Sequence, residues 1–246
     1  MKPSEQQIGM LHTLTTVKFL ATVGEQNKVN VAPIISTDYY KDDLLVFGDF
    51  LMWKTKQNLL TDNRVGILVM DENLNYFTAK GTFLGFETQG EAFDLVNSSP
   101  LIKYNAYTGM RSVGLIRLDA LSATATISKL RIVREAIPGV FSRKKMVVKP
   151  VVGEKFARIK ALKALAYLED DWPAAVPVPV CRIDGETLVF RNAGYPAGVA
   201  AALTVITMDP VTYQVKGTLT AEGDMGKLKV EEVYAGGMPV PGKRIS

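Results

Sequence analysis

Runs of β-branched, aliphatic and aromatic residues alternate with short polar turns along most of the chain. The first three runs cover residues 17–23, 29–36 and 44–48, and polar turns at 24–27 and 41–43 separate them. Because such runs joined by short turns pair with their neighbours, this region predicts an antiparallel meander. Three further strands are predicted in the first half, at residues 64–70, 76–87 and 113–127.

Helical patterns are shorter and fewer. Ser4 followed by Gln7 makes a capping box, and Ile8, Leu11 and Leu14 give a first helix one apolar face. Two more short helices are predicted, at residues 54–61 and 90–96. Many strands with few helices favour a barrel over a doubly wound sheet, so the predicted fold class is mainly β with a few helices.

The second half of the chain repeats strand patterns of the first half. The run 31–36 leads through a polar turn to 44–47, and the run 176–181 leads through Asp184-Gly185 to 187–190. Two short motifs extend the match: Met70-Asp71 with Met208-Asp209, and Lys80-Gly81-Thr82 with Lys216-Gly217-Thr218. A tandem of two related β units explains this agreement, and the alternative is chance recurrence of strand–turn–strand patterns.

The composition excludes several classes of protein. The chain has 246 residues, 47% hydrophobic and 22% charged, which excludes a disordered chain and allows one large domain or two ordinary ones. Cys181 is the single cysteine, so no internal disulfide forms. No apolar run approaches the roughly 18 residues that span a bilayer. We therefore expect a cytoplasmic protein without a membrane segment.

His12 is the single histidine, and this excludes several catalytic chemistries. Zinc sites need three or four ligands at set spacings, and no CxxC, HxxxH or HExxH occurs, so no metal site is predicted. A Ser-His-Asp triad would need His12 itself, and no GxSxG motif accompanies it. If the protein performs chemistry, a bound cofactor carries it.

A basic segment interrupts the repeat. Residues 129–163 hold eleven Lys or Arg against two Glu, a local charge of +9, which leaves about −5 for the rest of a chain whose total is +4. The segment is interpreted as a strand, a turn at Pro138-Gly139 and an amphipathic helix at 154–168. Its charges then form a solvated surface or a surface for nucleic acid or a protein partner. The predicted domains are residues 1–149 and 150–246, divided near Pro150.

The two halves differ where the candidate chemistry lies. Residues 50–59 of the first half are replaced by the shorter 191–198 in the second. The first-half segment contains Trp53, Lys54 and Thr55 at the start of a predicted helix. Backbone N–H groups at a helix N-terminus, with a lysine and a hydroxyl, suit a phosphate. The alternative is that Thr55 caps the helix and the lysine points into water.

The order of these elements resembles a known family. A helix and a strand come first and are followed by residues 30–35. A second strand then ends before residues 52–59. Residues 62–65 lead through a further strand to residues 80–83. This order is similar to that of the FMN-binding split-barrel proteins, which include pyridoxamine 5'-phosphate oxidase-like proteins and small bacterial FMN-binding proteins. The resemblance covers residues 5–127 and implies a split β-barrel that binds FMN.

The resemblance also implies a site. The phosphate would be held by Lys54 and Thr55 together with a strand residue at Pro33 or Ser36. Trp53 would cover the flavin or fill an interface. The cofactor-binding residues implied are Ala32, Pro33, Ile34, Ile35, Ser36, Phe47, Gly48, Asp49, Trp53, Lys54 and Thr55. The open face could be shaped by Tyr76, Tyr104, Tyr107 and Arg111.

The function implied is that of a flavin-dependent oxidoreductase or an electron carrier, with a small molecule or a protein as its redox partner. The strand arginine of pyridoxamine-phosphate oxidases is absent from residues 29–35, so that substrate is not implied. Flavin sites of this family lie between two barrels, so either two chains form a homodimer or residues 150–246 replace the second subunit as a pseudo-dimer. The alternatives are a flavin-free binding module that uses the basic segment, and haem or a deazaflavin in the same groove.

Overall fold

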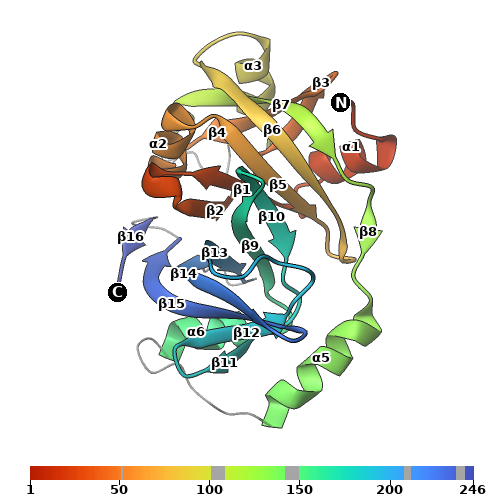
Figure 1. Ribbon diagram of the computed structural model, residues 1–246. Coiled ribbons are helices and arrows are strands. Elements are labelled where there is room, and N and C mark those ends of the chain that lie inside the picture. The colour runs from red at the N-terminus through yellow and green to blue at the C-terminus, as the bar shows by residue number, and fades with distance from the viewer. Residues whose placement is uncertain (51, 101–108, 142–149, 208–211, 237–241) are drawn as a thin grey trace.

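Two antiparallel sheets of similar topology make up the protein (Figure 1). The computed structural model describes residues 1–50, 52–100, 109–141, 150–207, 212–236 and 242–246, with side chains described outside 137–141. The first sheet has the strand order β2-β1-β5-β6-β7-β4-β3, and the second has β10-β9-β13-β14-β15-β12-β11. The two orders are identical when the second is renumbered from β9. The predicted fold class, mainly β in a tandem of two related units, is therefore confirmed.

Within its described residues, the first unit carries three α-helices. These are α1 (Glu5–His12), α2 (Trp53–Thr61) and α3 (Glu91–Asn97), with a short 3-10 turn at Glu25–Asn27. The strands of the first unit are β1 (Val17–Val23), β2 (Val29–Pro33), β3 (Asp38–Lys41), β4 (Leu44–Asp49), β5 (Arg64–Met70), β6 (Asn75–Glu87), β7 (Ser112–Leu121) and β8 (Ala125–Thr126).

The second unit follows helix α5 (Lys129–Phe141) and begins with helix α6 (Pro150–Ala157). Its strands are β9 (Leu162–Glu169), β10 (Trp172–Pro177), β11 (Arg182–Asp184), β12 (Thr187–Arg191), β13 (Val199–Ile206), β14 (Thr212–Glu222), β15 (Met225–Ala235) and β16 (Lys243–Arg244). In Figure 1 this unit lies below the first, and α5 runs along its side.

The repeated Lys-Gly-Thr motif marks a β-bulge at the same place in both sheets. The pairing of β6 with β7 shifts between Lys80 and Gly81, and that of β14 with β15 shifts between Lys216 and Gly217. A Cβ on Gly217 would lie 1.7 Å from the carbonyl oxygen of Lys229. Glycine is therefore required where the bulge brings the strands together, which gives this part of the repeat a physical reason.

The register of the paired strands changes how the two halves of the sequence align. Lys80 pairs with Gly66 and Lys216 pairs with Ala202, so Met70 corresponds to Ile206 and not to Met208. The Met-Asp match is therefore out of register by two residues, and Met208-Asp209 itself lies outside the described residues. The same register aligns Pro33, the last residue of β2, with Pro177, the last residue of β10.

Two buried lysines also occupy matching places in the two units. Lys18 on β1 donates from Nζ to the carbonyl of Thr13, 2.8 Å away, and Lys163 on β9 donates to the carbonyl of Arg158, 2.9 Å away. Both side chains are about 1% exposed. Each ammonium therefore replaces water by carbonyl oxygens at the base of its barrel, as a buried cation requires.

Each sheet surrounds its own apolar core, and a third core joins the units. Phe19, Val31 and Leu68 of the first unit pack against Ala164 and Ala202 of the second. Small alanines on one side allow a close approach of the two sheets. Gly66 of β5 faces β10 so closely that a Cβ there would lie 2.1 Å from the carbonyl oxygen of Pro173. The units are thus packed face to face within one chain.

Hydrogen bonds and ion pairs tie the same faces together. Trp172 donates from Nε1 to the carbonyl of Val65 over 3.2 Å, and Arg64 donates to the carbonyl of Asp171. Lys80 and Glu169 form an ion pair of 3.5 Å near the same edge. These polar contacts surround the apolar contact and fix its register.

The basic segment differs from its predicted structure. The predicted strand and Pro138-Gly139 turn are wrong, because helix α5 runs from Lys129 to Phe141. Ser128 accepts the N–H of Arg131 at the start of this helix, over 3.4 Å, and Arg131 pairs with Glu135 one turn later at 2.7 Å. These local contacts favour a helix in the segment before the proline.

The predicted helix at residues 154–168 is also wrong. Helix α6 ends at Ala157 and β9 begins at Leu162. Strand β9 is buried on both faces, since Leu165 enters the core of the second unit and Ala166 enters the core between the units. A strand buried on both faces has no polar alternation, so its sequence resembles a continuous apolar run.

Smaller differences lie at strand ends. The four-residue strand β3 was not predicted, and the predicted strand 113–127 is divided into β7 and β8. Within the described residues, no helix is long and apolar enough to span a membrane.

Candidate functional site

A groove lies where the first unit's β2 and α2 meet the second unit's β13, β14 and β15. Its first wall comes from Ala32, Pro33 and Ile34 of the first unit, with Lys54 and Thr55 at the start of α2. The remaining residues that line it are Asn30, Val31, Met52, Trp53, Thr204, Thr212, Gln214, Tyr234, Ala235, Gly236 and Gly242. The groove therefore exists only because the two units are docked.

Helix α2 is held in place by buried polar contacts. Lys56 pairs with the 1%-exposed Asp49 at 2.6 Å, so the end of β4 is tied to the first turn of the helix. Asn58 donates to the hydroxyl of Thr22 over 3.0 Å. Thr55 is buried and accepts from the amide of Asn30 over 3.4 Å. These contacts orient the helix so that its N-terminus faces the groove.

Two side chains of the second unit donate hydrogen bonds to the first unit on the floor of the groove. Thr204 donates from Oγ1 to the carbonyl of Val31 over 2.6 Å, and Gln214 donates from Nε2 to the same oxygen. A third, Lys216, donates to the carbonyl of Val29. The outer edge of β2 is therefore covered by side chains of the second unit, which continue the polar part of the site.

Lys54 crosses from one unit to the other. Its Nζ lies 3.7 Å from the centre of the Tyr234 ring, a cation–π contact. Burial, with the positive charges of Lys28 and Arg244 nearby, lowers the pKa of Lys54. The Tyr234 hydroxyl donates to Glu232 over 2.7 Å. Desolvation and this carboxylate raise the pKa of Tyr234 to about 12, so the ring remains neutral.

The structure brings part of the predicted site together. Of the eleven predicted residues, six line the groove: Ala32, Pro33, Ile34, Trp53, Lys54 and Thr55. The other five are Ile35, Ser36, Phe47, Gly48 and Asp49, and they are not among its lining residues.

The contacts of three of these outlying residues explain their placement. Phe47 is fully buried in the core of the first unit. Ser36 accepts the backbone N–H of Gly48 over 3.1 Å, so its hydroxyl joins β4 to the preceding turn. The carboxylate of Asp49 is bound by Lys56 at 2.6 Å and by Ser112 at 3.2 Å. These groups support the elements behind the groove.

Trp53 lies at the mouth of the groove and is 61% exposed. The guanidinium of Arg111 lies 5.2 Å from the centre of its ring. Arg111 therefore lies beside the mouth of the groove, and its role at an open face stays a prediction. Tyr76 packs instead in the core between the units. Tyr104 and Tyr107 lie outside the described residues.

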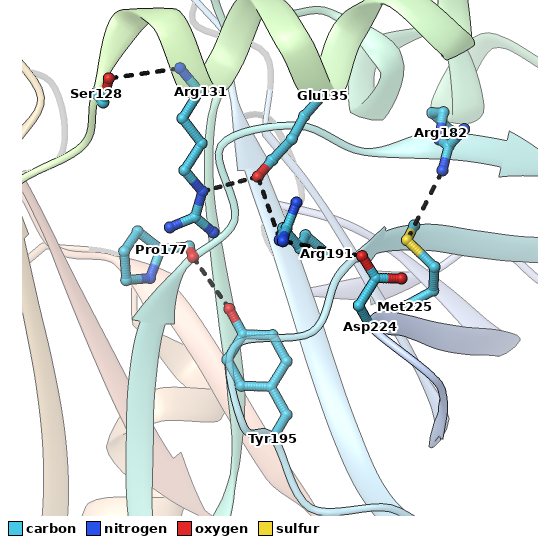
Figure 2. Close-up of polar contacts among 9 residues, drawn as sticks. All are labelled: Ser128, Arg131, Glu135, Pro177, Arg182, Arg191, Tyr195, Asp224 and Met225. Carbon is cyan, nitrogen blue, oxygen red and sulfur yellow. Dashed lines mark hydrogen bonds and ion pairs between the residues drawn. The ribbon is translucent and has the colours of Figure 1, made fainter.

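The matching position in the second unit is built differently. No helix follows β12, and residues 192–198 form a loop without helix or strand. Figure 2 shows Tyr195 of this loop under helix α5, with its hydroxyl directed at the carbonyl of Pro177, 3.4 Å away. Glu135 of α5 pairs with Arg131 at 2.7 Å and with Arg191 at 4.0 Å. The loop that carries Tyr195 thus stands between β12 and β13, where the first unit has α2 between β4 and β5.

Sequence reasoning missed the second wall of the groove. Lys216 stood inside a repeat motif, and Asn30 stood within the segment 30–35 that carries the resemblance, but neither was assigned to the site. Nothing in the sequence placed Thr204, Gln214 or Tyr234 opposite them, because their contact depends on how two distant units dock.

His12 is not part of the groove. Its Nδ1 lies 2.7 Å from Asp38 on β3, and its ring contacts Tyr39 edge-on. Within the described ranges, no group of three His, Cys, Asp or Glu could hold a metal ion.

The basic segment does not form one charged face across the residues described. Lys163 is buried, and its ammonium donates to the carbonyls of Arg158, Ala161 and Pro179. Arg158 pairs with Glu154 at 3.6 Å and Arg131 pairs with Glu135, so part of the charge is neutralised locally. The predicted residues 143–145 and 149 of this segment lie outside the described part of the chain.

No protein-family model and no curated protein matches the sequence. Solved structures are similar to about half of the chain. HupZ from Group A Streptococcus is 17% identical over 51% of this chain and 99% of its own, with a TM-score of 0.42. An FMN-binding protein from Syntrophomonas wolfei is 15% identical over 50% of this chain and 89% of its own, with a TM-score of 0.40. HutZ, the heme storage protein from Vibrio cholerae, is 16% identical over 51% and 97%, with a TM-score of 0.38. These similarities cover about half of the chain at 15–17% identity.

Proposed function

We propose that this chain binds FMN in the groove between its two units and acts as a flavin-dependent oxidoreductase or electron carrier. The observation that carries the proposal is the position of Lys54 and Thr55 in the first turn of α2, where both line the groove. An anion at this point meets unpaired backbone N–H groups, the positive end of the helix dipole and an ammonium.

The residues of the groove fit such a ligand. Ala32, Pro33 and Ile34 offer an apolar wall for a planar ring, and Trp53 offers an aromatic face at the mouth. Lys54 would hold the phosphate, with the N–H groups of the first turn of α2. Bound FMN would supply hydride or electron transfer, while the chain fixes its position and excludes water. No side chain is assigned as an acid or base.

We also propose that one chain holds one flavin. Residues 150–246 would replace the second subunit of a dimer, with α6 as the start of this unit. Asymmetry supports this proposal, because a loop that carries Tyr195 stands between β12 and β13, where the first unit has α2. The second groove would then have no phosphate-binding helix.

A haem ligand is the second candidate, because HutZ is named for heme storage. Haem iron in proteins is held most often by histidine, and His12 is bound to Asp38 outside the groove. The geometry therefore favours the flavin.

The test is the visible absorption spectrum of the purified protein, with the ligand released by denaturation and identified by mass. A flavin spectrum with FMN released at one per chain, on a particle with the mass of one chain, would support both proposals. A Soret band would favour haem. A colourless protein that also fails to bind added FMN would refute the cofactor, and two flavins per chain would refute the asymmetry.

A further inference from the structure

Two lysines from different units meet beside the groove. Lys54 comes from α2 of the first unit, and Lys216 comes from the bulge of β14 in the second. Their Nζ atoms lie 3.7 Å and 5.8 Å from the centre of the same ring, that of Tyr234. Both lysines also line the same hollow beside the groove. Lys216 is only 7% exposed and Lys54 is half-buried, so two like groups lie close together away from bulk water.

The surrounding charges do not neutralise the pair. Glu232 is the nearby carboxylate, and it already accepts from the Tyr234 hydroxyl and pairs with Arg244 at 3.5 Å and Lys28 at 3.9 Å. Among the residues that the structure describes, neither Lys54 nor Lys216 has a carboxylate within ion-pair distance. Lys54, Lys216 and Tyr234 line a hollow that adjoins the groove, and the exposed Glu25 lines the same hollow.

The corresponding lysine of the first unit is satisfied in a different way. Lys80 occupies the same bulge position, is 38% exposed and pairs with Glu169 at 3.5 Å. The repeat therefore keeps the lysine but not its carboxylate partner. The contrast indicates that the position of Lys216 is set up for a partner from outside the chain.

The unpaired arrangement has an electrostatic consequence. Burial and the charge of Lys54 lower the pKa of Lys216 to about 7, although Glu232 opposes this shift. Two like charges in contact disfavour each other's ionisation, and an anion between them would remove the penalty. The amine Nζ of Lys216 already donates to the carbonyl of Val29, which fixes its direction.

We propose that Lys54 and Lys216 bind the same anionic group, so that the phosphate of the ligand is held by one lysine from each unit. The identity of the ligand as FMN rests on the proposed function above, whereas the two-lysine anion site does not. The second unit thereby supplies a binding residue and not only a wall. Anion binding should draw a proton onto Lys216, with Lys28, Lys54, Arg244, Glu232, Tyr234 and Glu25 as its charged and titratable surroundings.

The experiment compares Lys216→Met with Lys80→Met, the matched change in the first unit. Binding of FMN and of riboflavin is measured for each by flavin fluorescence. We expect Lys216→Met to weaken FMN about ten- to a hundred-fold and riboflavin less than two-fold, as loss of a charge-assisted contact requires. Lys80→Met should leave both affinities unchanged. Equal losses for FMN and riboflavin, or equal effects of the two variants, would overturn the proposal.

Two further measurements distinguish loss of the anion site from a folding defect of the variant and from a wrong assignment of the cofactor. In the unaltered protein, FMN affinity should fall between pH 7 and 9, where the phosphate is already a dianion, while riboflavin affinity stays constant. A flat FMN profile would count against Lys216. Pyrophosphate should raise the thermal midpoint of the protein, and Lys216→Met should remove this rise. If FMN fails to bind but the pyrophosphate effect remains, the anion site stands and the flavin function falls; if neither ligand binds, both fall.

Discussion

The ammonium of Lys54 lies 3.7 Å from the centre of the Tyr234 ring, so a helix of the first unit contacts a strand of the second across the groove. Cation–π contacts contribute about 0.5–2 kcal/mol, depending on how dry the site is. This contact aims the lysine along the groove without neutralising its charge. Lys54 is thereby held ready for an anion.

Lys54→Ala should weaken FMN by about 1.5–3 kcal/mol, because a hydrogen bond to a charged group is lost. Riboflavin lacks the phosphate and should bind the variant as well as it binds the unaltered protein. Titration of both ligands, followed by flavin fluorescence, measures the difference. If both ligands lose affinity equally, Lys54 supports the fold of the groove and does not contact the phosphate.

Tyr234 permits a test of the ring apart from its hydroxyl. Tyr234→Leu removes the aromatic face beneath Lys54 and should weaken FMN several-fold, since the lysine loses its orienting contact. Tyr234→Phe keeps the face and loses only the hydrogen bond to Glu232. We therefore expect Tyr234→Phe to bind FMN more tightly than Tyr234→Leu in the same titration. The reverse order would show that the hydroxyl, through Glu232, controls the site.

Most strands of this protein can be predicted from its sequence, and so can the wall of the groove that the first unit provides. Strand β1 and strand β5 have the predicted bounds, because each run is ended by polar turn residues. Strand β9 was mistaken for a helix because both of its faces are buried. A local sequence pattern shows the periodicity of apolar residues, but it does not show whether both faces of a strand are buried.

The same limit explains the site. Lys54 and Thr55 are adjacent in sequence and lie in the first turn of a helix, so a local pattern identifies them. Gln214 reaches β2, and Tyr234 reaches Lys54 of α2, only because the two units dock. The residues in each of these contacts are more than 150 positions apart in the sequence. Such contacts have no local signature, and the internal repeat predicted two units without predicting which faces meet.

Gly66→Val tests the docking of the units. A Cβ at this position would lie 2.1 Å from the carbonyl oxygen of Pro173 in a backbone-to-backbone approach, so β5 and β10 would have to separate. We expect a loss of about 1–3 kcal/mol in the free energy of unfolding, measured by chemical denaturation, as in other overpacked cores. FMN affinity should fall as well, because the groove has walls from both units.

The matched control for Gly66→Val is Gly85→Val in the same first unit. Gly85 has no neighbour within 4 Å of a built Cβ, but its φ of 144° also disfavours valine. That variant should therefore lose stability without loss of FMN affinity in the folded protein. Equal FMN loss in the two variants would mean that general destabilisation, and not docking, controls the groove.

Buried lysines should make the protein more stable at mildly alkaline pH. Burial lowers the pKa of Lys18 and of Lys163 to about 8, from an ordinary value of 10.5. Between these values the unfolded chain binds more protons than the folded chain, so the free energy of unfolding rises with pH. Each group contributes at most about 1.4 kcal/mol per pH unit.

Cys181 opposes this trend above its ordinary pKa. Burial raises the pKa of the thiol to about 12 from 9, so between these values the folded chain keeps a proton that the unfolded chain loses. The rise in stability should therefore be clearest from pH 8 to 9, measured by chemical denaturation at intervals across this range. Lys163→Met should reduce the slope, and Lys2→Met, at an exposed position, should preserve it. A slope that is unchanged in Lys163→Met would mean that its ammonium keeps its proton inside the fold, held by the three carbonyl oxygens that accept from it.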